Sequence, residues 1–193
     1  KHGEVGWLKV SMFPGAIGID VARDIDKAIK SLDCERLIID LRGNTGGGIG
    51  CLRLMSYLTP DQVPVGYSVT RRRAEQSFSK EKLPVFDRIP SKKIGLIGLL
   101  LKFARRDQSV AIATERLGKQ RFHGKVVLLV NEHSASSCEM VAAFASENRL
   151  ATIVGTKTPG RLLGGHSFRV GSGYRIALPV AAYYTWSGTF LGS

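Results

Sequence analysis

The sequence lacks any apolar run long enough to cross a membrane as a helix. The longest run, residues 94–101 (IGLIGLLL), has eight residues, whereas a spanning helix needs about 20. Cysteine is also scarce, with three among 193 residues, which excludes a disulfide scaffold. The three show no metal-ligand spacing, so we predict free and mostly buried thiols at Cys34, Cys51 and Cys138.

Neither an initiator methionine nor an apolar leader opens the chain, because Lys1 is followed directly by His-Gly-Glu. Such a start is typical of an excised domain or a mature fragment. Hydrophobic residues make up 44% of the sequence, a fraction that excludes intrinsic disorder. The length fits one domain with a substantial buried core.

Acidic residues are few, 16 against 28 Lys and Arg, which gives a net charge of +12. Residues 71–125 hold 15 Lys and Arg against 5 Asp and Glu, and so carry ten of those twelve excess charges. This stretch is typical of a solvated surface, and it could also attract an anionic membrane surface. Its few aromatic residues argue against nucleic acid as a partner. Within it, residues 92–106 predict a short apolar helix with basic ends, either buried, facing a partner or lying at a membrane interface.

Strand and helix patterns alternate along the rest of the chain, which predicts an α/β core with a less regular basic insertion at about 71–120. Asp20 is the expected N-cap of the first helix, and the last two strands are expected to form a hairpin. The expected strands are 5–13, 36–41, 65–70, 125–130, 152–155, 175–179 and 181–185, and the expected helices are 20–32, 51–58 and 138–147.

A glycine-rich segment, residues 40–48 (DLRGNTGGG), follows a buried strand. It does not match the dinucleotide pattern G-x-G-x-x-G and lacks the lysine of a Walker A loop, so it does not indicate a phosphate site. Bare glycine N–H groups could instead hold an oxyanion. The structural interpretation is a tight turn built from glycines with positive φ.

A second segment, residues 131–140 (NEHSASSCEM), leads from a buried strand through small residues into a helix. This is the setting of an exposed nucleophile at a helix N-terminus, where free N–H groups favour developing negative charge. Ser136 or Ser134 could be the nucleophile, with Cys138 as a rival that fits the core better. The structural interpretation is a capping box with Ser136 as N-cap and Glu139 at N3.

A third segment, residues 155–165 (GTKTPGRLLGG), is dense in glycine and basic residues. It could hold a catalytic base, clamp a substrate or form a basic surface loop. Together, the three segments in this order resemble peptidase family S41, the C-terminal processing (tail-specific) serine proteases, whose core has the ClpP/crotonase-like fold. The opening GWLKVSMFPG and the late TWSG also fit that family. The resemblance covers most of the chain except about 71–120.

This resemblance implies a single protease core over residues 1–193 that cleaves polypeptides through an acyl-enzyme on Ser136. The N–H groups of Ser137 and of Gly46 or Gly47 would form its oxyanion hole. It implies a polypeptide substrate, no metal or organic cofactor, and a periplasmic or otherwise extracytoplasmic location, and it leaves the oligomeric state open. The family often carries a PDZ or helical segment ahead of the core, and this chain is expected to lack one.

One position departs from the family pattern. Arg161 stands where the resemblance places a lysine base, and a guanidinium cannot give up its proton in a protein. Three interpretations stay open. The base is a histidine from a preceding segment, as in tricorn-like members; or it is a local group, with Lys157, His133 or His166 as candidates; or the chain is a non-catalytic relative that binds a peptide or an apolar ligand.

Overall fold

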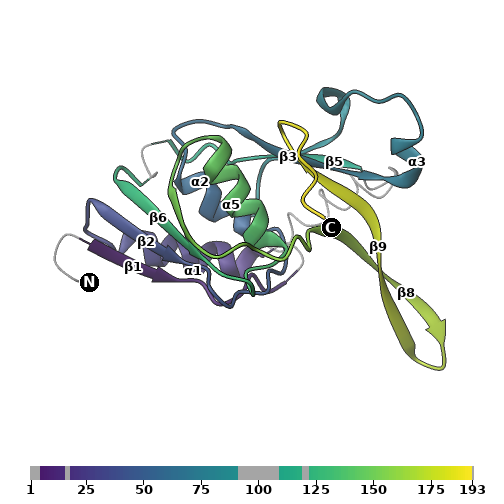
Figure 1. The fold of residues 1–193 in the computed structure, drawn as a ribbon, viewed down its shortest axis with the longest axis horizontal. Helices are drawn as coiled ribbons and strands as arrows, with labels where there is room; N and C mark the ends of the chain where they lie inside the picture. Colours follow the sequence, from purple (N-terminus) through teal and green to yellow (C-terminus); the bar gives the residue numbers. More distant parts are fainter. Residues whose placement is uncertain (1–4, 16–17, 91–108, 119–121, 193) are drawn as a thin grey trace.

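The computed structural model describes residues 5–15, 18–90, 109–118 and 122–192. These residues form two sheets, with helices α2 and α5 lying between them (Figure 1). The mixture of parallel and antiparallel strands with covering helices confirms the predicted α/β class. The predicted apolar helix at 92–106 lies outside the described residues.

The first sheet is fully parallel, in the order β1-β2-β6-β7. Its central strands are the two continuous apolar runs of the sequence, as burial on both faces requires. Asp40, the last residue of β2, lies opposite Leu129 near the end of β6. The segments that follow these strands therefore leave the sheet at the same edge. The strands are β1 (Val5–Lys9), β2 (Arg36–Asp40), β6 (Lys125–Val130) and β7 (Thr152–Gly155).

Three helices pack with this sheet: α1 (Ile19–Lys30), α2 (Cys51–Tyr57) and α5 (Ser137–Glu147). The expectation that Asp20 caps α1 is wrong, because the N-cap is Gly18 with φ 66° and Asp20 lies in the first turn. A Cβ at position 18 would collide with the backbone of Gly50. The close approach of these two glycines therefore decides where α1 begins.

The second sheet has the order β4-β5-β3-β9-β8 and is antiparallel except for the β4–β5 pair. Part of the predicted basic insertion belongs to it, since β4 and β5 both come from that region. The helical turns α3 and η1, also from that region, lie outside the strands. The elements are β3 (Pro64–Thr70), α3 (Arg71–Ala74), η1 (Lys80–Lys82), β4 (Val85–Phe86), β5 (Val110–Ala113), β8 (Leu163–Gly171) and β9 (Tyr174–Thr185).

The predicted hairpin between 175–179 and 181–185 is wrong, because both runs belong to the single strand β9. Pro179 suggested a break, yet the pairing continues past it through a register shift between Gly164 and Gly165 of β8. A bulge of this kind accommodates a residue that has no N–H to donate. The hairpin is instead β8–β9, which projects from the body of the molecule (Figure 1).

A partly buried ion network ties α1 and α2 to the chain that follows β5. Arg53 donates to Asp26 at 2.6 Å and to both oxygens of Glu115 at 2.6 and 3.0 Å. Tyr57 donates its hydroxyl to the same Asp26 at 2.8 Å. Each carboxylate is thus paired where burial would otherwise penalise its charge.

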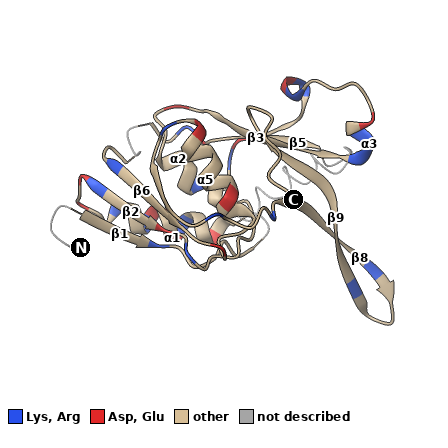
Figure 2. Cartoon of the chain, in the orientation of Figure 1, with Lys and Arg blue, Asp and Glu red and all other residues tan. Residues whose placement is uncertain are grey.

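Lys and Arg residues lie on α3 and on the β8–β9 hairpin, among other places (Figure 2). Arg71 and Arg72 are exposed on α3. Binding of an anionic membrane surface by residues 71–125 stays a prediction, since 91–108 and 119–121 fall outside the described part of that region. Among the helices that the structure describes, none has the length and apolar character of a membrane span.

We expect Asp40 to make the stability of the fold depend on acid pH. Its carboxylate is 4% exposed and accepts two bonds from Arg42 at 3.0 Å, which lower its pKa from 3.8 to about 2. A depressed carboxyl pKa stabilises the fold above the ordinary value, by about 2 kcal/mol here. This contribution is lost as the pH falls from about 4 towards 2.

Urea unfolding of the native protein and of Asp40→Asn between pH 7 and pH 2.5 measures this effect. The native protein should lose stability relative to the variant over the acid range. Asp20→Asn, at an exposed carboxylate 3.4 Å from Arg23, is the control and should follow the native curve. Parallel curves for the native protein and Asp40→Asn would contradict the assignment.

Candidate active site

Ser136 occupies a sharp turn between β6 and α5. Its backbone has φ 57° and ψ −117°, a conformation that residues other than glycine rarely adopt. The predicted capping box with Glu139 is confirmed, and the Ser136 N–H donates to Glu139 Oε2 at 2.8 Å. The side chain is half-buried, so a strained turn holds an accessible hydroxyl where a helix begins.

The glycine-rich segment that follows β2 lies directly against this turn. A Cβ built at Gly46 would be 2.6 Å from Ser136 Cβ and 3.0 Å from the Ser137 nitrogen. Ser137 Oγ donates to the carbonyl oxygen of Gly47 at 2.9 Å. Two segments about 90 residues apart in the sequence are thus in contact, as the parallel strands that precede them led us to expect. Gly46 leaves no room for a side chain.

The N–H groups of this glycine segment are not equivalent. Gly46 donates its N–H to Asn44 Oδ1 at 2.8 Å. Of the two glycines that the sequence offered as oxyanion-hole donors, Gly46 is therefore already engaged. Asn44 is fully buried and donates its own amide to the Val10 carbonyl at 2.9 Å. In contrast, the N–H groups of Gly47 and Ser137 donate to no acceptor among the described residues. Sequence reasoning missed Asn44, although a lone Asn inside a glycine turn is a typical turn-fixing residue.

The two rival nucleophiles of the second segment are structural. Ser134 is fully buried, donates its hydroxyl to the Leu41 carbonyl at 2.9 Å and accepts the Asn131 N–H at 2.9 Å. Cys138 is fully buried, and burial raises the pKa of its thiol to about 12. A thiol with that pKa does not form a thiolate near neutral pH.

The cysteine prediction is confirmed, because all three thiols are free. Cys51 and Cys138 are buried, and Cys34 is half-buried. Across the described ranges, the structure brings together no group of three His, Cys, Asp or Glu side chains that could hold a metal ion.

Glu139 connects the third segment to the Ser136 turn. Its Oε1 accepts the Gly160 N–H at 2.5 Å, and its Oε2 accepts the Arg161 N–H at 2.8 Å. With the bond from Ser136, this buried carboxylate receives three backbone N–H groups. Glu139 therefore sets the position of the loop that carries Arg161. The sequence indicated only its bond within the helix turn, because nothing in the spacing reveals the contact with 160–161.

Ser136 lines two cavities. The first, of about 480 Å³, we call the Arg161 cavity; it is lined by Gly43, Thr45, Glu132, His133, Ala135, Ser136, Pro159 and Arg161. The second, of about 240 Å³, we call the Met140 cavity; it is lined by Gly47, Gly48, Ile49, Ser68, Ile112, Ser136, Ser137, Met140, Leu162, Leu163, Gly164, Gly165 and Tyr183. A molecule that occupies either cavity therefore lies next to Ser136.

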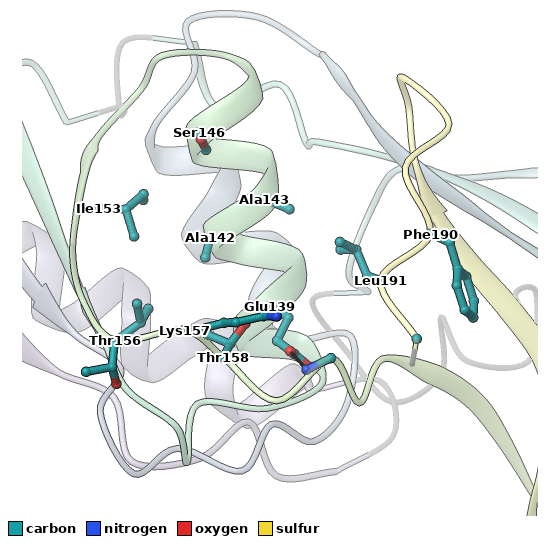
Figure 3. A pocket seen from close by; sticks show the side chains of 13 residues that line it. Glu139, Ala142, Ala143, Ser146, Ile153, Thr156, Lys157, Thr158, Phe190 and Leu191 are labelled. Atoms are coloured by element: carbon teal, nitrogen blue, oxygen red, sulfur yellow. Dashed lines mark hydrogen bonds between the residues drawn. The ribbon is translucent and has the colours of Figure 1, made fainter.

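Of the four sequence candidates for a base or substrate contact, two share a cavity with Ser136. Arg161 and the exposed His133 line the Arg161 cavity, and His133 Nε2 lies 3.7 Å from Glu132 Oε1. Lys157 lines a different cavity, beside Glu139 and α5 (Figure 3). His166 lies on β8 with its ring 4.8 Å from that of Phe168.

Comparison with known proteins places this chain in a peptidase family. The family model described as peptidase family S41 matches residues 4–192. The chain is 25% identical over 186 residues to a carboxyl-terminal-processing protease of Picosynechococcus sp., covering 96% of this chain and 36% of the relative. It is 33% identical over 191 residues to a carboxy-terminal-processing protease of Bartonella bacilliformis, covering 97% and 36%.

A solved structure of a photosystem II D1 C-terminal processing protease superposes on the fold. Its TM-score is 0.68 at 18% identity, and the match covers 100% of this chain and 42% of that one. This similarity supports the family assignment at the level of the fold. The chain spans about a third of the length of the curated relatives that it matches.

Proposed function

Because this chain belongs to peptidase family S41, we propose that it forms the core of a serine-type peptidase with Ser136 as the nucleophile. The observation that carries the proposal is the contact between the Ser136 turn and the glycine segment. It sets an accessible hydroxyl beside two N–H groups that have no acceptor among the residues that the structure describes. The relatives are named as C-terminal processing proteases, which supports a polypeptide as the substrate.

In this proposal Ser136 Oγ adds to the carbonyl carbon of the scissile amide, and its proton passes to a base. The carbonyl oxygen then carries negative charge, which the N–H groups of Ser137 and Gly47 stabilise. Cleavage of the C–N bond releases the amine and leaves an ester on Ser136, which water hydrolyses. Loss of one such N–H donor typically costs about 10²–10³ in rate.

The base must be a group that can take up a proton near neutral pH. Arg161 cannot do so, and it is better suited to hold a carboxylate or carbonyl of the substrate. Among the residues that the structure describes, His133 is the candidate, because it shares the Arg161 cavity with Ser136. A histidine from a segment outside these 193 residues is the alternative that the sequence left open.

The polypeptide would bind in an extended form along the edge of β8 that pairs with no other described strand. This strand is the last in its sheet, and Leu163, Gly164 and Gly165 at its start line the Met140 cavity. Main-chain hydrogen bonds to such an edge give affinity, and pockets for alternate side chains give selectivity.

A fluorophosphonate probe tests the nucleophile, because it reacts with activated serines. We expect stoichiometric labelling that peptide mapping assigns to Ser136, and none on the Ser136→Ala variant. Ser146→Ala, in the last turn of α5, is the control and should label like the native protein. A slower reaction of His133→Ala would identify His133 as the base, and an unchanged rate would assign that role elsewhere. Failure of the native protein to label when the segment that precedes these residues is also present would leave a binding module and overturn the peptidase proposal.

A further inference from the structure

The β8–β9 hairpin leaves the body of the molecule, and none of the residues that the structure describes covers its outer part (Figure 1). Every residue from 165 to 179 is exposed. A two-stranded hairpin is only marginally stable in water, and it is stabilised by a third strand or by packing of its apolar side chains. The outer part of this hairpin therefore has the properties of a surface that receives a partner.

The pairing register gives the hairpin an apolar face. Phe168 of β8 lies directly opposite Ile176 of β9. His166 lies opposite Leu178, and its ring is 4.8 Å from that of Phe168, so these four side chains share one face. Phe168, Ile176 and Leu178 are 41%, 43% and 45% exposed. Adjacent exposed apolar side chains of this kind mark interaction sites.

The opposite face of the hairpin is basic (Figure 2). Arg169 and Arg175 lie directly opposite each other, and like charges in such a pair are destabilising. Arg175 reaches across to β8, where it donates to Ser167 Oγ at 2.9 Å and to the Ser167 carbonyl oxygen at 3.0 Å. The Arg169 side chain forms no hydrogen bond or ion pair within the described residues. An acidic side chain beside the two guanidinium groups would offset their repulsion.

The hairpin continues the strand edge that would bind the polypeptide. Leu163, Gly164 and Gly165 at the start of β8 line a cavity with Ser136, and the strand runs on from there into the hairpin. A third strand on this edge would direct successive side chains to the two faces in turn. A side chain beside Phe168 would meet apolar groups, and its neighbour would meet the arginines.

We propose that the β8–β9 hairpin is a second substrate-binding surface, away from Ser136, which selects a polypeptide segment of alternating apolar and acidic residues. The segment adds to β8 as a third strand, with apolar side chains beside Phe168 and acidic side chains beside Arg169. This selection rests on the peptidase function proposed above. Main-chain pairing accepts many sequences, whereas two unlike faces favour one alternation of side chains.

Two peptides of identical composition test the selection without requiring turnover. One octapeptide alternates valine and glutamate, and the other places all its valines before its glutamates. Each carries a fluorophore, and fluorescence anisotropy with the Ser136→Ala protein measures the two dissociation constants. We expect the alternating peptide to bind about tenfold more tightly, because several cross-strand pairs then act together.

An exchange of charge tests the role of the arginines. In the Ser136→Ala protein, Arg169→Glu should weaken binding of the valine–glutamate peptide about tenfold and should strengthen binding of an alternating valine–lysine peptide. Phe168→Ser should remove the preference for the alternating order. Both positions are exposed, so neither substitution removes a side chain from the core.

Trp7→Ser and Arg36→Glu are the matched controls. They change one exposed apolar and one exposed basic side chain on the first sheet, outside the hairpin. Both variants should bind the alternating peptide like the Ser136→Ala protein. A loss of affinity in Arg36→Glu as large as that in Arg169→Glu would assign the binding to net charge and overturn the selection.

Equal binding of the two valine–glutamate peptides, or a preference that survives both Phe168→Ser and Arg169→Glu, would also overturn it. Vesicles of phosphatidylglycerol provide a further arm. If the protein binds them and Phe168→Ser abolishes that binding while the peptides bind alike, the apolar face belongs to a membrane contact and the selection is wrong.

The fluorophosphonate reaction of the native protein separates these results from failure of the peptidase proposal itself. If Ser136 labels and the peptides show no preference, only the role of the hairpin is wrong. If the alternating peptide is preferred and Ser136 does not label, the hairpin binds such segments and the peptidase proposal fails.

Discussion

Replacing Ser136 with glycine is expected to abolish peptide hydrolysis and, at the same time, to stabilise the fold. The hydroxyl that would attack the carbonyl is removed, and loss of such a nucleophile typically lowers kcat by about 10⁴-fold or more. Ser136 also has φ 57° and ψ −117°, a conformation that costs a non-glycine residue roughly 1–3 kcal/mol. Glycine adopts it without that strain, although it loses more entropy on folding.

The balance of these two effects is a gain of about 1 kcal/mol, or a Tm higher by about 2–4 °C for a chain of this size. Scanning calorimetry of the native protein and of Ser136→Gly measures this difference in Tm. Ser136→Ala is the matched control, since it removes the same hydroxyl but keeps a Cβ in the strained turn, and it should show no comparable rise. A Tm of Ser136→Gly at or below that of Ser136→Ala would show that the turn stores no strain.

Replacing Glu139 with alanine is expected to cause the second large effect. The substitution removes no reacting group, but it releases the Ser136 turn and the loop at 160–161 from the carboxylate that positions them. Its carboxylate accepts N–H groups from Ser136, Gly160 and Arg161, and alanine would leave all three without that partner. A hydrogen bond to a charged group contributes about 1.5–3 kcal/mol. We expect a loss of roughly 3 kcal/mol in unfolding free energy and at least a tenfold slower reaction of Ser136 with the fluorophosphonate.

Urea unfolding and the labelling rate test this expectation together. Glu139→Gln keeps one amide oxygen as an acceptor and should lie between the native protein and Glu139→Ala in both measurements. Glu147→Ala is the control at the other end of α5, where the carboxylate accepts one bond from Ser187; it should label at the native rate. A Glu139→Ala protein that labels at the native rate would show that the loop keeps its place without this carboxylate.

The central strands of the first sheet and the helices that pack with it were predicted from local patterns in the sequence. The apolar runs at 36–40 and 125–130 are too continuous for strands with a solvated face, and they form the centre of the parallel sheet. The same patterns mislead at Pro179. A local interpretation ends the strand at this proline, whereas β9 continues through a bulge, since its Ala181 and Pro179 pair with the adjacent Gly164 and Gly165 of β8.

The residues of the second sheet that come from the middle of the chain could not be predicted in this way. Val85 and Phe86 form a strand of only two residues, and its stability comes from pairing with Ala111 and Ile112 of β5. A short segment of this kind has no periodicity of its own, because its partner supplies the hydrogen bonds. β8 was missed for a related reason, since its glycines and basic residues are typical of a loop.

By itself, the sequence determined that a serine would stand where a helix begins and that a glycine turn would follow a neighbouring buried strand. Both features depend on backbone preferences within a few residues, which act before any long-range contact forms. Only the tertiary structure decided which glycine N–H is free, because Asn44 takes that of Gly46. It also gave the β8–β9 hairpin one apolar and one basic face, because the register of the two strands decides which side chains lie together.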